Sequence, residues 1–144
     1  MVGSSLVLAN LVELLPKPWH EIIDLKLLED ISKKLTDDFI PSKDSIFSCL
    51  ELEPSEVKVV ILGQDPYPNP THAMGLAFSV NSSIRPLPAS LSNIFKELDS
   101  DLGIQRSNGD LSEWASQGVL LLNRSLTVIP KLSDSHSDLS LIHI

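Results

Sequence analysis

Residues 57–80, VKVVILGQDPYPNPTHAMGLAFSV, decide the fold class of this chain. They open with an apolar run, residues 57–62, in which only Lys58 is polar. Such a β-branched run predicts a strand buried on both faces, as in a parallel α/β sheet. The strand ends at Gly63, because three of the next seven residues are prolines, which fix φ and lack a donor N–H. We therefore expect a stiff loop at the carboxyl end of this strand, where open α/β sheets bind their ligands.

The predicted loop is rich in side chains that can bind or react. Gln64, Asp65, Tyr67 and Asn69 fall within one short segment. An isolated aspartate before a proline most often forms an Asx-turn, so Asp65 alone does not identify a catalytic site. The density of such groups directly after a buried strand makes this segment the candidate active-site loop.

Helical patterns follow the loop. Ser90 can cap a helix over residues 90–98, whose apolar positions have helical spacing. Asp110 and Glu113 have the spacing of a capping box on a second, shorter helix, which Gly118 ends. Helices between two strands predict a parallel pair with a right-handed crossover.

The second strand of that pair is residues 119–122, another short apolar run, and it ends at Asn123. An asparagine that ends a strand is common and needs no functional explanation. Because parallel strands bring their carboxyl ends to one edge of the sheet, we expect Asp65 and Asn123 to converge on a common cavity.

The patterns of the remaining segments predict secondary structure. Residues 5–15 predict a helix capped by Ser4 or Ser5, and residues 19–35 predict one or two amphipathic helices. Residues 75–80 predict an extended segment. The fold class is therefore α/β, with a central parallel sheet flanked by helices, in one domain over the 144 residues.

Charge and composition bear on the class of partner. The net charge is −8, of which residues 1–56 contribute −6 and residues 57–144 contribute −2. An acidic chain is unusual for a protein that binds DNA phosphates, although most of the acidity precedes the candidate loop. Cys49 is the single cysteine, no apolar run is long enough for a membrane span, and no secretory signal is evident. These features predict an intracellular protein without disulfides, and no cluster of histidines and cysteines predicts a metal site.

Three long stretches resemble family 1 uracil-DNA glycosylases, in the same order along the chain. The resemblance runs from about residue 19 to residue 136. The stretches are GQDPYP with HAMGLAFSV (63–68 and 72–80), LPASLSNIFKEL (87–98) and GDLSEWASQGVLLLNRSLTV (109–128).

The resemblance implies a DNA-repair enzyme. Members of the family hydrolyse the N-glycosidic bond of deoxyuridine in single- or double-stranded DNA, flipping the base into a tight pocket and releasing free uracil. They need no metal or cofactor. The resemblance further implies a monomer without a membrane anchor, an inhibitor protein as a possible partner, and a location in the cytoplasm of a bacterium or in the nucleus or mitochondrion of a eukaryote.

By the same resemblance, Asp65 is the catalytic residue, which activates water and stabilises positive charge on the sugar. Asn123 binds the base, since a primary amide can pair with the N3–H and O4 edge of uracil and reject cytosine. Phe78 stacks on the base, although core packing explains a phenylalanine in an apolar run equally well. Tyr67 excludes the 5-methyl group of thymine, and Gln64 helps to bind the base.

Two further residues are implied contacts to a DNA phosphate, Ser90 and Pro88 before it. Helix capping explains Ser90 as well, and the two roles are compatible. Pro68 stands where many members of the family carry histidine, and its side chain can neither donate nor accept a hydrogen bond. We expect a modest effect of this difference on activity. His72 follows in the loop without evidence that it substitutes.

The C-terminal part departs from the family. The family's His-Pro-Ser-Pro-Leu segment, which supplies an anion-stabilising histidine, has no counterpart, and His143 in LSLIHI does not match it. Losing an oxyanion-type donor costs on the order of 10²–10³ in rate. We therefore expect a partial domain truncated at the C-terminus, with the C-terminal strands of the sheet missing and residues 139–144 foreign to the fold.

Two other classes of function stay open. One is a non-catalytic remnant that binds uracil, DNA or a partner protein weakly. The other is an unrelated α/β hydrolase or nucleotide-binding protein that uses the same strand-loop-helix arrangement. Cleavage of uracil-containing DNA separates the first from an enzyme, and stabilisation by free uracil alone argues against the second.

Overall fold

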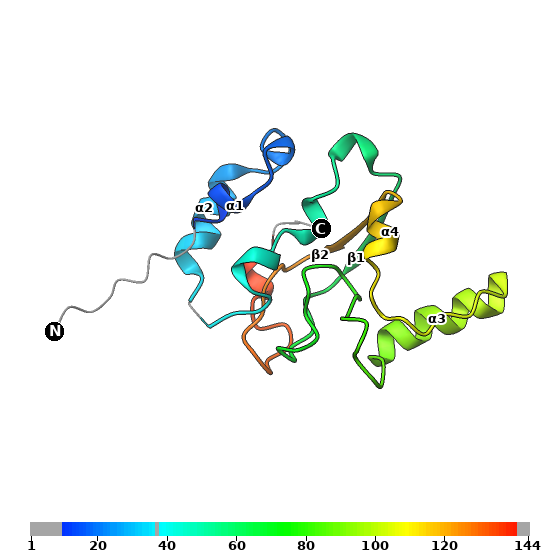
Figure 1. Ribbon diagram of the computed structural model, residues 1–144. Helices are drawn as coiled ribbons and strands as arrows, with labels where there is room; N and C mark the ends of the chain where they lie inside the picture. Colours follow the sequence, from blue (N-terminus) through cyan, green and yellow to red (C-terminus); the bar gives the residue numbers. More distant parts are fainter. Residues whose placement is uncertain (1–9, 37, 141–144) are drawn as a thin grey trace.

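The computed structural model describes residues 10–36 and 38–140, and its centre is a pair of parallel strands (Figure 1). β1 (Val59–Gly63) and β2 (Val119–Asn123) are paired from Val59 with Val119 to Gly63 with Asn123. The predicted parallel pair and the α/β fold class are therefore confirmed. Because the strands are in register, both carboxyl ends lie at one edge of the sheet.

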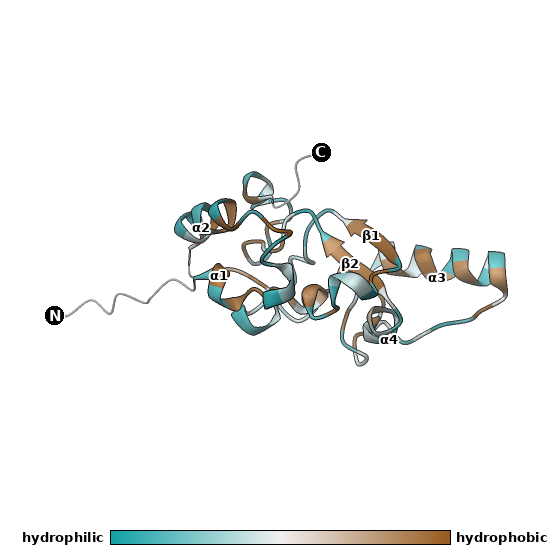
Figure 2. Cartoon of the chain, turned by 90° about the horizontal axis from the view of Figure 1, so that it is seen from above, coloured by the Kyte–Doolittle hydropathy of each residue, from teal (hydrophilic) through white to brown (hydrophobic). Residues whose placement is uncertain are grey.

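Short helices surround the strands. In both views α1 and α2 lie near each other, whereas α3 projects away from the rest of the described chain (Figures 1 and 2). The α-helices are α1 (Leu11–Leu14), α2 (Leu25–Lys34), α3 (Ala89–Leu102) and α4 (Ser112–Ser116), and the 3₁₀ helices are η1 (Lys17–Trp19), η2 (Lys43–Ser45), η3 (Ser48–Leu50), η4 (Pro54–Glu56) and η5 (Ser137–Leu139).

The N-terminal helices follow the sequence pattern in part. Of the helix predicted over residues 5–15, the described portion is α1, and Asn10 caps it by accepting a hydrogen bond from the Val12 N–H. The predicted caps Ser4 and Ser5 lie outside the described residues. The segment 19–35 contains α2, whose N-cap Asp24 accepts hydrogen bonds from two N–H groups of the first turn.

α3 begins two residues earlier than a helix capped by Ser90 would. Its N-cap is Pro88, which makes no side-chain capping bond, so the prediction that Ser90 caps the helix is wrong. Ser90 instead lies in the first turn, with its hydroxyl 3.3 Å from the hydroxyl of Tyr67. The helix ends at Gly103, whose φ of 66° is the left-handed conformation common at helix C-termini.

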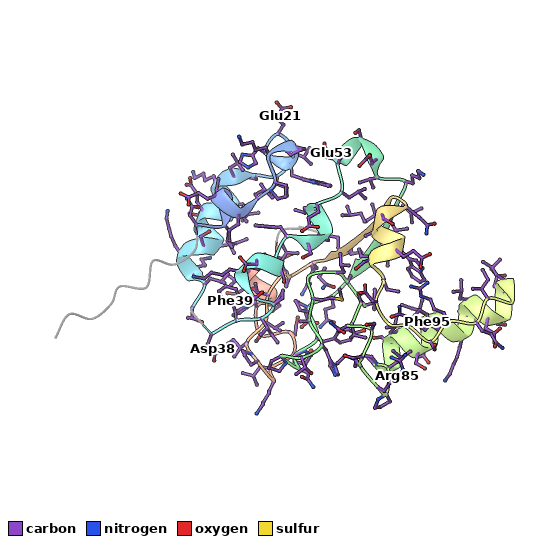
Figure 3. The ribbon with its side chains drawn as sticks, in the orientation of Figure 1. Glu21, Asp38, Phe39, Glu53, Arg85 and Phe95 are labelled. Atoms are coloured by element: carbon purple, nitrogen blue, oxygen red, sulfur yellow. The ribbon has the colours of Figure 1, made fainter. Side chains whose placement is uncertain are left out.

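The capping box predicted for α4 does not form. The Glu113 carboxylate lies 3.2 Å from the Arg106 guanidinium instead of reaching back to the backbone. The same guanidinium lies over the rings of Phe95 and Trp114, at 5.9 and 5.5 Å from their centroids (Phe95 is labelled in Figure 3). Asp110 accepts a hydrogen bond from the Ser112 N–H. Arg106 therefore pairs with Glu113 in place of the cap, and its guanidinium contacts both α3 and α4.

Burial of β1 on both faces is also a wrong prediction. Val59, Val60 and Leu62 are 52%, 56% and 43% exposed, although the strand is as apolar as expected (Figure 2). Among the described residues, β1 has a strand neighbour only on the β2 side. β2 is better covered, with Leu120 and Leu121 buried.

Residues 75–80 are not the predicted extended segment. They form turns, in which Gly75 and Phe78 have positive φ, 82° and 65°. The segment still runs beside the sheet, because the Ala77 N–H donates to the carbonyl of Leu121 at 3.0 Å. It thereby brings Phe78 to the edge at which β1 and β2 end.

The core is one cluster of buried residues that extends from β2 to the N-terminal helices. Leu91 and Leu111 are fully buried, as is Leu28 of α2. No helix within residues 10–36 and 38–140 is long and apolar enough to cross a bilayer.

Leu121→Ala tests the position of the core. Leu121 is 1% exposed at the centre of β2, so its truncation should lower the free energy of unfolding by about 2–5 kcal/mol. Leu102→Ala is the control, because Leu102 is 62% exposed at the end of α3 and should change stability by about 0.5 kcal/mol or less. Urea unfolding measures both. Equal effects would contradict the assignment of Leu121 to the core.

Candidate active site

The edge at which the strands end brings two distant segments together. Gly63 and Asn123 are the last paired residues of β1 and β2. Beyond them the pairing continues, because the Arg124 N–H donates to the Gly63 carbonyl at 2.9 Å and the Ser125 N–H donates to the Gln64 carbonyl at 3.1 Å. The loop after β1 is therefore held against the segment after β2.

A cavity of about 230 Å³ opens at this edge. It brings together every predicted site residue except Pro88, which is the N-cap residue of α3. The roles assigned to these side chains stay predictions. The residues that line the cavity are Gln64, Asp65, Pro66, Tyr67, Pro68, Phe78, Ser90, Asn123 and Ser133.

A larger cavity, of about 420 Å³, lies among η3, η4 and α4. Its walls include Met74, Leu76 and Ala115, with Glu51 and Glu56 as its charged groups. None of the predicted site residues lines it. The smaller cavity is therefore the better candidate for the active site, because volume alone does not identify one.

Asp65 is oriented by residues far along the chain. Its Oδ2 accepts a hydrogen bond from the backbone N–H of Asp134 and lies 3.4 Å from the Ser133 hydroxyl. Its Oδ1 has only a long contact, 3.4 Å, to the side-chain amide of Gln64. The simple Asx-turn is thus not what holds this carboxylate. One oxygen is fixed and the other retains capacity to accept a hydrogen bond.

Asn123 is 7% exposed, and its side-chain amide forms no hydrogen bond with any other residue that the structure describes. Because Asn123 lines the cavity, its amide has donors and an acceptor available there. Gly63 leaves room for it, because a Cβ at that position would fall on Asn123 Oδ1. A glycine at the end of β1 is therefore required by the amide on β2.

Phe78 and Tyr67 form one wall of the cavity. Phe78 has a φ of 65°, an uncommon conformation for a bulky residue and one that needs support from its surroundings. The Tyr67 hydroxyl donates to the Phe78 carbonyl at 2.8 Å and lies 3.3 Å from the Ser90 hydroxyl. Burial raises the pKa of Tyr67, and the contact with Ser90 partly opposes the rise. One hydroxyl thus joins the aromatic wall to the start of α3.

The neighbouring loop residues have structural contacts. The Pro68 carbonyl accepts a hydrogen bond from the Lys131 N–H at 2.7 Å, a role that needs no histidine side chain. His72 packs edge-on against the Tyr67 ring, with centroids 6.0 Å apart, and does not line the cavity. Arg85 (Figure 3) is the exposed cation of the loop before α3, and its guanidinium bonds to the carbonyls of that loop.

Sequence reasoning missed the part played by residues 133 and 134. Ser133 lines the cavity, and the backbone of Asp134 holds the aspartate of the loop. No local sequence pattern predicts these contacts. The SDSHS stretch, residues 133–137, is unusually polar, with three serines and a histidine, but this does not indicate a partner. His143 lies outside the described residues. Within the described ranges, no three His, Cys, Asp or Glu side chains form a group that could hold a metal ion.

Comparisons with known proteins agree with this architecture. Residues 50–143 match the model of the uracil DNA glycosylase superfamily. A uracil-DNA glycosylase of Corynebacterium efficiens is 47% identical over 128 residues, covering 82% of this chain and 54% of the relative. One from Mycobacterium sp. (strain KMS) is 54% identical over 99 residues, covering 68% of this chain and 44% of the relative. The chain thus spans about half the length of the curated relatives that it matches.

Solved structures give the same result. The crystal structure of mimivirus uracil-DNA glycosylase superposes with a TM-score of 0.79 at 29% identity, covering 93% of this chain and 55% of that one. The wild-type enzyme structure from Nitratifractor salsuginis has a TM-score of 0.57 at 22% identity, covering 92% of this chain and 70% of that one, and so supports the fold alone.

Titration of Tyr67 tests the aromatic wall. Because it is the only tyrosine in the chain, its ionisation can be followed by ultraviolet absorbance without ambiguity. Burial should place its midpoint above the usual value of about 10, and Ser90→Ala should move it higher still, since the Ser90 contact lowers the pKa. Since the unfolded chain ionises first, stability should fall as the pH rises above about 10. A midpoint unchanged by Ser90→Ala would contradict the contact.

Proposed function

Because the chain belongs to the uracil DNA glycosylase superfamily, we propose that it hydrolyses the N-glycosidic bond of deoxyuridine in DNA, releasing uracil and leaving an abasic site. The observation that carries the proposal is the amide of Asn123, which lines the same small cavity as Asp65 and has no hydrogen-bond partner among the described residues. A cavity of this kind admits a single extruded base, so the reaction requires base flipping.

Asn123 recognises the base. Its amide offers an acceptor to the N3–H of uracil and a donor to O4. Cytosine presents an amine in place of O4, which would leave two donors facing each other at Asn123, a residue only 7% exposed. Hydrogen-bonding sites of this type discriminate strongly, because the wrong ligand leaves a buried group unpaired.

Asp65 acts on the sugar and on water. The glycosidic bond breaks through a state with positive charge on the sugar, which a nearby carboxylate stabilises. Its Oδ2 is held by the Asp134 N–H, so the remaining oxygen is the one that can orient the attacking water. The carboxylate needs no metal for this task.

The aromatic wall selects and holds the flipped base. Phe78 stacks on it, since every base offers a π-face to an aromatic ring. Tyr67 occupies the space that the 5-methyl group of thymine would need, and Gln64 adds a polar contact at the cavity rim. The hydrogen bond from the Tyr67 hydroxyl to the Phe78 carbonyl supports the uncommon backbone conformation of the stacking residue.

DNA phosphates bind beside the cavity. Ser90 in the first turn of α3 and Pro88 at its N-cap place backbone and hydroxyl groups where an anion is favoured. The net charge of −8 weakens long-range attraction to DNA, so we expect weak affinity for DNA.

The partners of the relatives extend the proposal. The Y322F variant of the mimivirus enzyme has been solved in complex with UGI, and we infer that an inhibitor protein of this kind binds this chain. The two curated relatives described above are bacterial, and we infer action on DNA in the bacterial cytoplasm, by a monomer.

Asp65→Asn tests the enzyme reading. The change keeps the shape of the side chain and removes its charge, so cleavage of uracil-containing single-stranded DNA after alkali should fall about 10²-fold or more. Uracil binding should be retained, because Asn123 and Phe78 are untouched. Asp101→Asn, an exposed carboxylate on α3, is the control and should change nothing. Uracil binding without any cleavage by the unaltered chain would instead indicate a non-catalytic binding protein.

Gly63→Ala tests the base-recognition role of Asn123. The added Cβ would fall on Asn123 Oδ1 and push the amide out of place, so uracil binding should weaken about 10-fold or more. Gly103→Ala is the control, because its Cβ meets nothing within 4 Å, so its left-handed φ of 66° costs stability without affecting the cavity. Calorimetric titration with uracil measures both variants. Unchanged binding by Gly63→Ala would remove Asn123 from the recognition site.

A further inference from the structure

A buried polar cluster lies behind the cavity and has no part in the proposed reaction. Ser125, Thr127 and His136 are 1%, 4% and 7% exposed. Thr127 Oγ1 lies 2.9 Å from His136 Nδ1, and the Ser125 hydroxyl donates to the His136 carbonyl at 3.1 Å. None of the three lines the cavity. Burying a polar side chain costs free energy unless it forms hydrogen bonds, so the bonds within this cluster are needed to keep it buried.

The cluster fixes one end of the segment 129–136. At the other end, Val128 forms two backbone hydrogen bonds with Ile40, at 2.9 and 3.0 Å. The Ile129 N–H also donates to the Ser135 hydroxyl at 2.7 Å, closing the segment on itself. The two ends are therefore anchored, and the residues between them form a loop of restricted freedom.

The tip of this loop contacts the active-site loop through two backbone N–H groups, besides the Ser133 hydroxyl. The Asp134 N–H donates to Asp65 Oδ2, and the Lys131 N–H donates to the Pro68 carbonyl at 2.7 Å. Lys131 and Asp134 both have positive φ, 67° and 57°. Non-glycine residues keep this conformation only where the surrounding structure enforces it. Release of an anchor should thus let the tip relax away from Asp65.

The ion pair between the tip and Arg124 is weaker than these hydrogen bonds. The Asp134 carboxylate lies 3.4 Å from the Arg124 guanidinium, and both side chains are substantially exposed, at 53% and 37%. Exposed ion pairs of this length contribute little, because water and salt screen them. A buried hydrogen bond whose loss would leave a polar group unpaired matters more. Burial also lowers the pKa of His136, against the opposing influences of Asp138 and Thr127, which favours the neutral imidazole that Thr127 can bond.

We propose that His136 is a positioning residue that, through its bond to Thr127 and the segment 129–136, holds the Asp65 carboxylate in its reactive orientation. The role of Asp65 rests on the proposed function. The link from His136 to Asp65 rests on the hydrogen bonds of the segment 129–136 alone. His136 touches neither the cavity nor the base, so its effect falls on the chemical step and not on binding. Small misplacements of a reacting group cost large factors in rate.

His136→Ala and Thr127→Val test the proposal in the full chain. Each should speed hydrogen exchange of the Asp134 amide about 10-fold and lower kcat about 10-fold, with KM changed less than about twofold. His136→Asn should restore most of both losses, because its amide can take the place of Nδ1. Ser137→Ala, an exposed neighbour in η5, is the control and should match the unaltered chain.

The two readouts separate the possible failures. If the unaltered chain cleaves no DNA, the proposed function fails, and amide exchange alone decides whether His136 holds the loop. Should His136→Ala not fold, Thr127→Val and His136→Asn carry the test. Unchanged exchange at Asp134 in the folded variants would overturn the proposal. The proposal would also be overturned if Ser137→Ala lowered kcat as much as His136→Ala does, or if the variants raised KM and left kcat unchanged.

Discussion

The parallel register of β1 and β2 is the constraint on which the site depends. It places Gly63 opposite Asn123, so that the loop after one strand and the segment after the other begin at the same point. A shift of one residue would turn the Asn123 side chain to the opposite face of the sheet. The absence of a side chain at Gly63 then gives the amide its space. Pairing of two five-residue strands therefore decides where the cavity forms.

The cavity is shaped by contacts between segments that are distant in the sequence. Asp65 is oriented from Asp134, 69 residues later, and the Tyr67 hydroxyl reaches both the Phe78 carbonyl and Ser90. Such contacts bind the active-site loop on two sides. Preorganisation of this kind matters for a glycosylase, whose charged groups must already be in place when charge develops on the sugar.

Much of this arrangement could be predicted from the sequence. The apolar runs that end at Gly63 and Asn123 indicate two strands, and the prolines after Gly63 indicate a stiff loop. Burial of β1 could not be predicted, because it depends on neighbours that a local pattern does not contain. The Asp110–Glu113 pattern failed because Arg106 competes for the glutamate. The contacts of residues 133–136 have no sequence signature, since they depend on backbone groups brought together by the fold.

The most direct test of the account is a titration of the isotope-labelled chain with free uracil, followed by nuclear magnetic resonance. The side-chain amide of Asn123 should shift saturably, together with the backbone amides of Asp65 and Phe78, because all three residues line one cavity. Shifts confined to the larger cavity, near Met74 and Ala115, or no saturable shift at Asn123, would contradict the claim that this edge of the sheet is the uracil site.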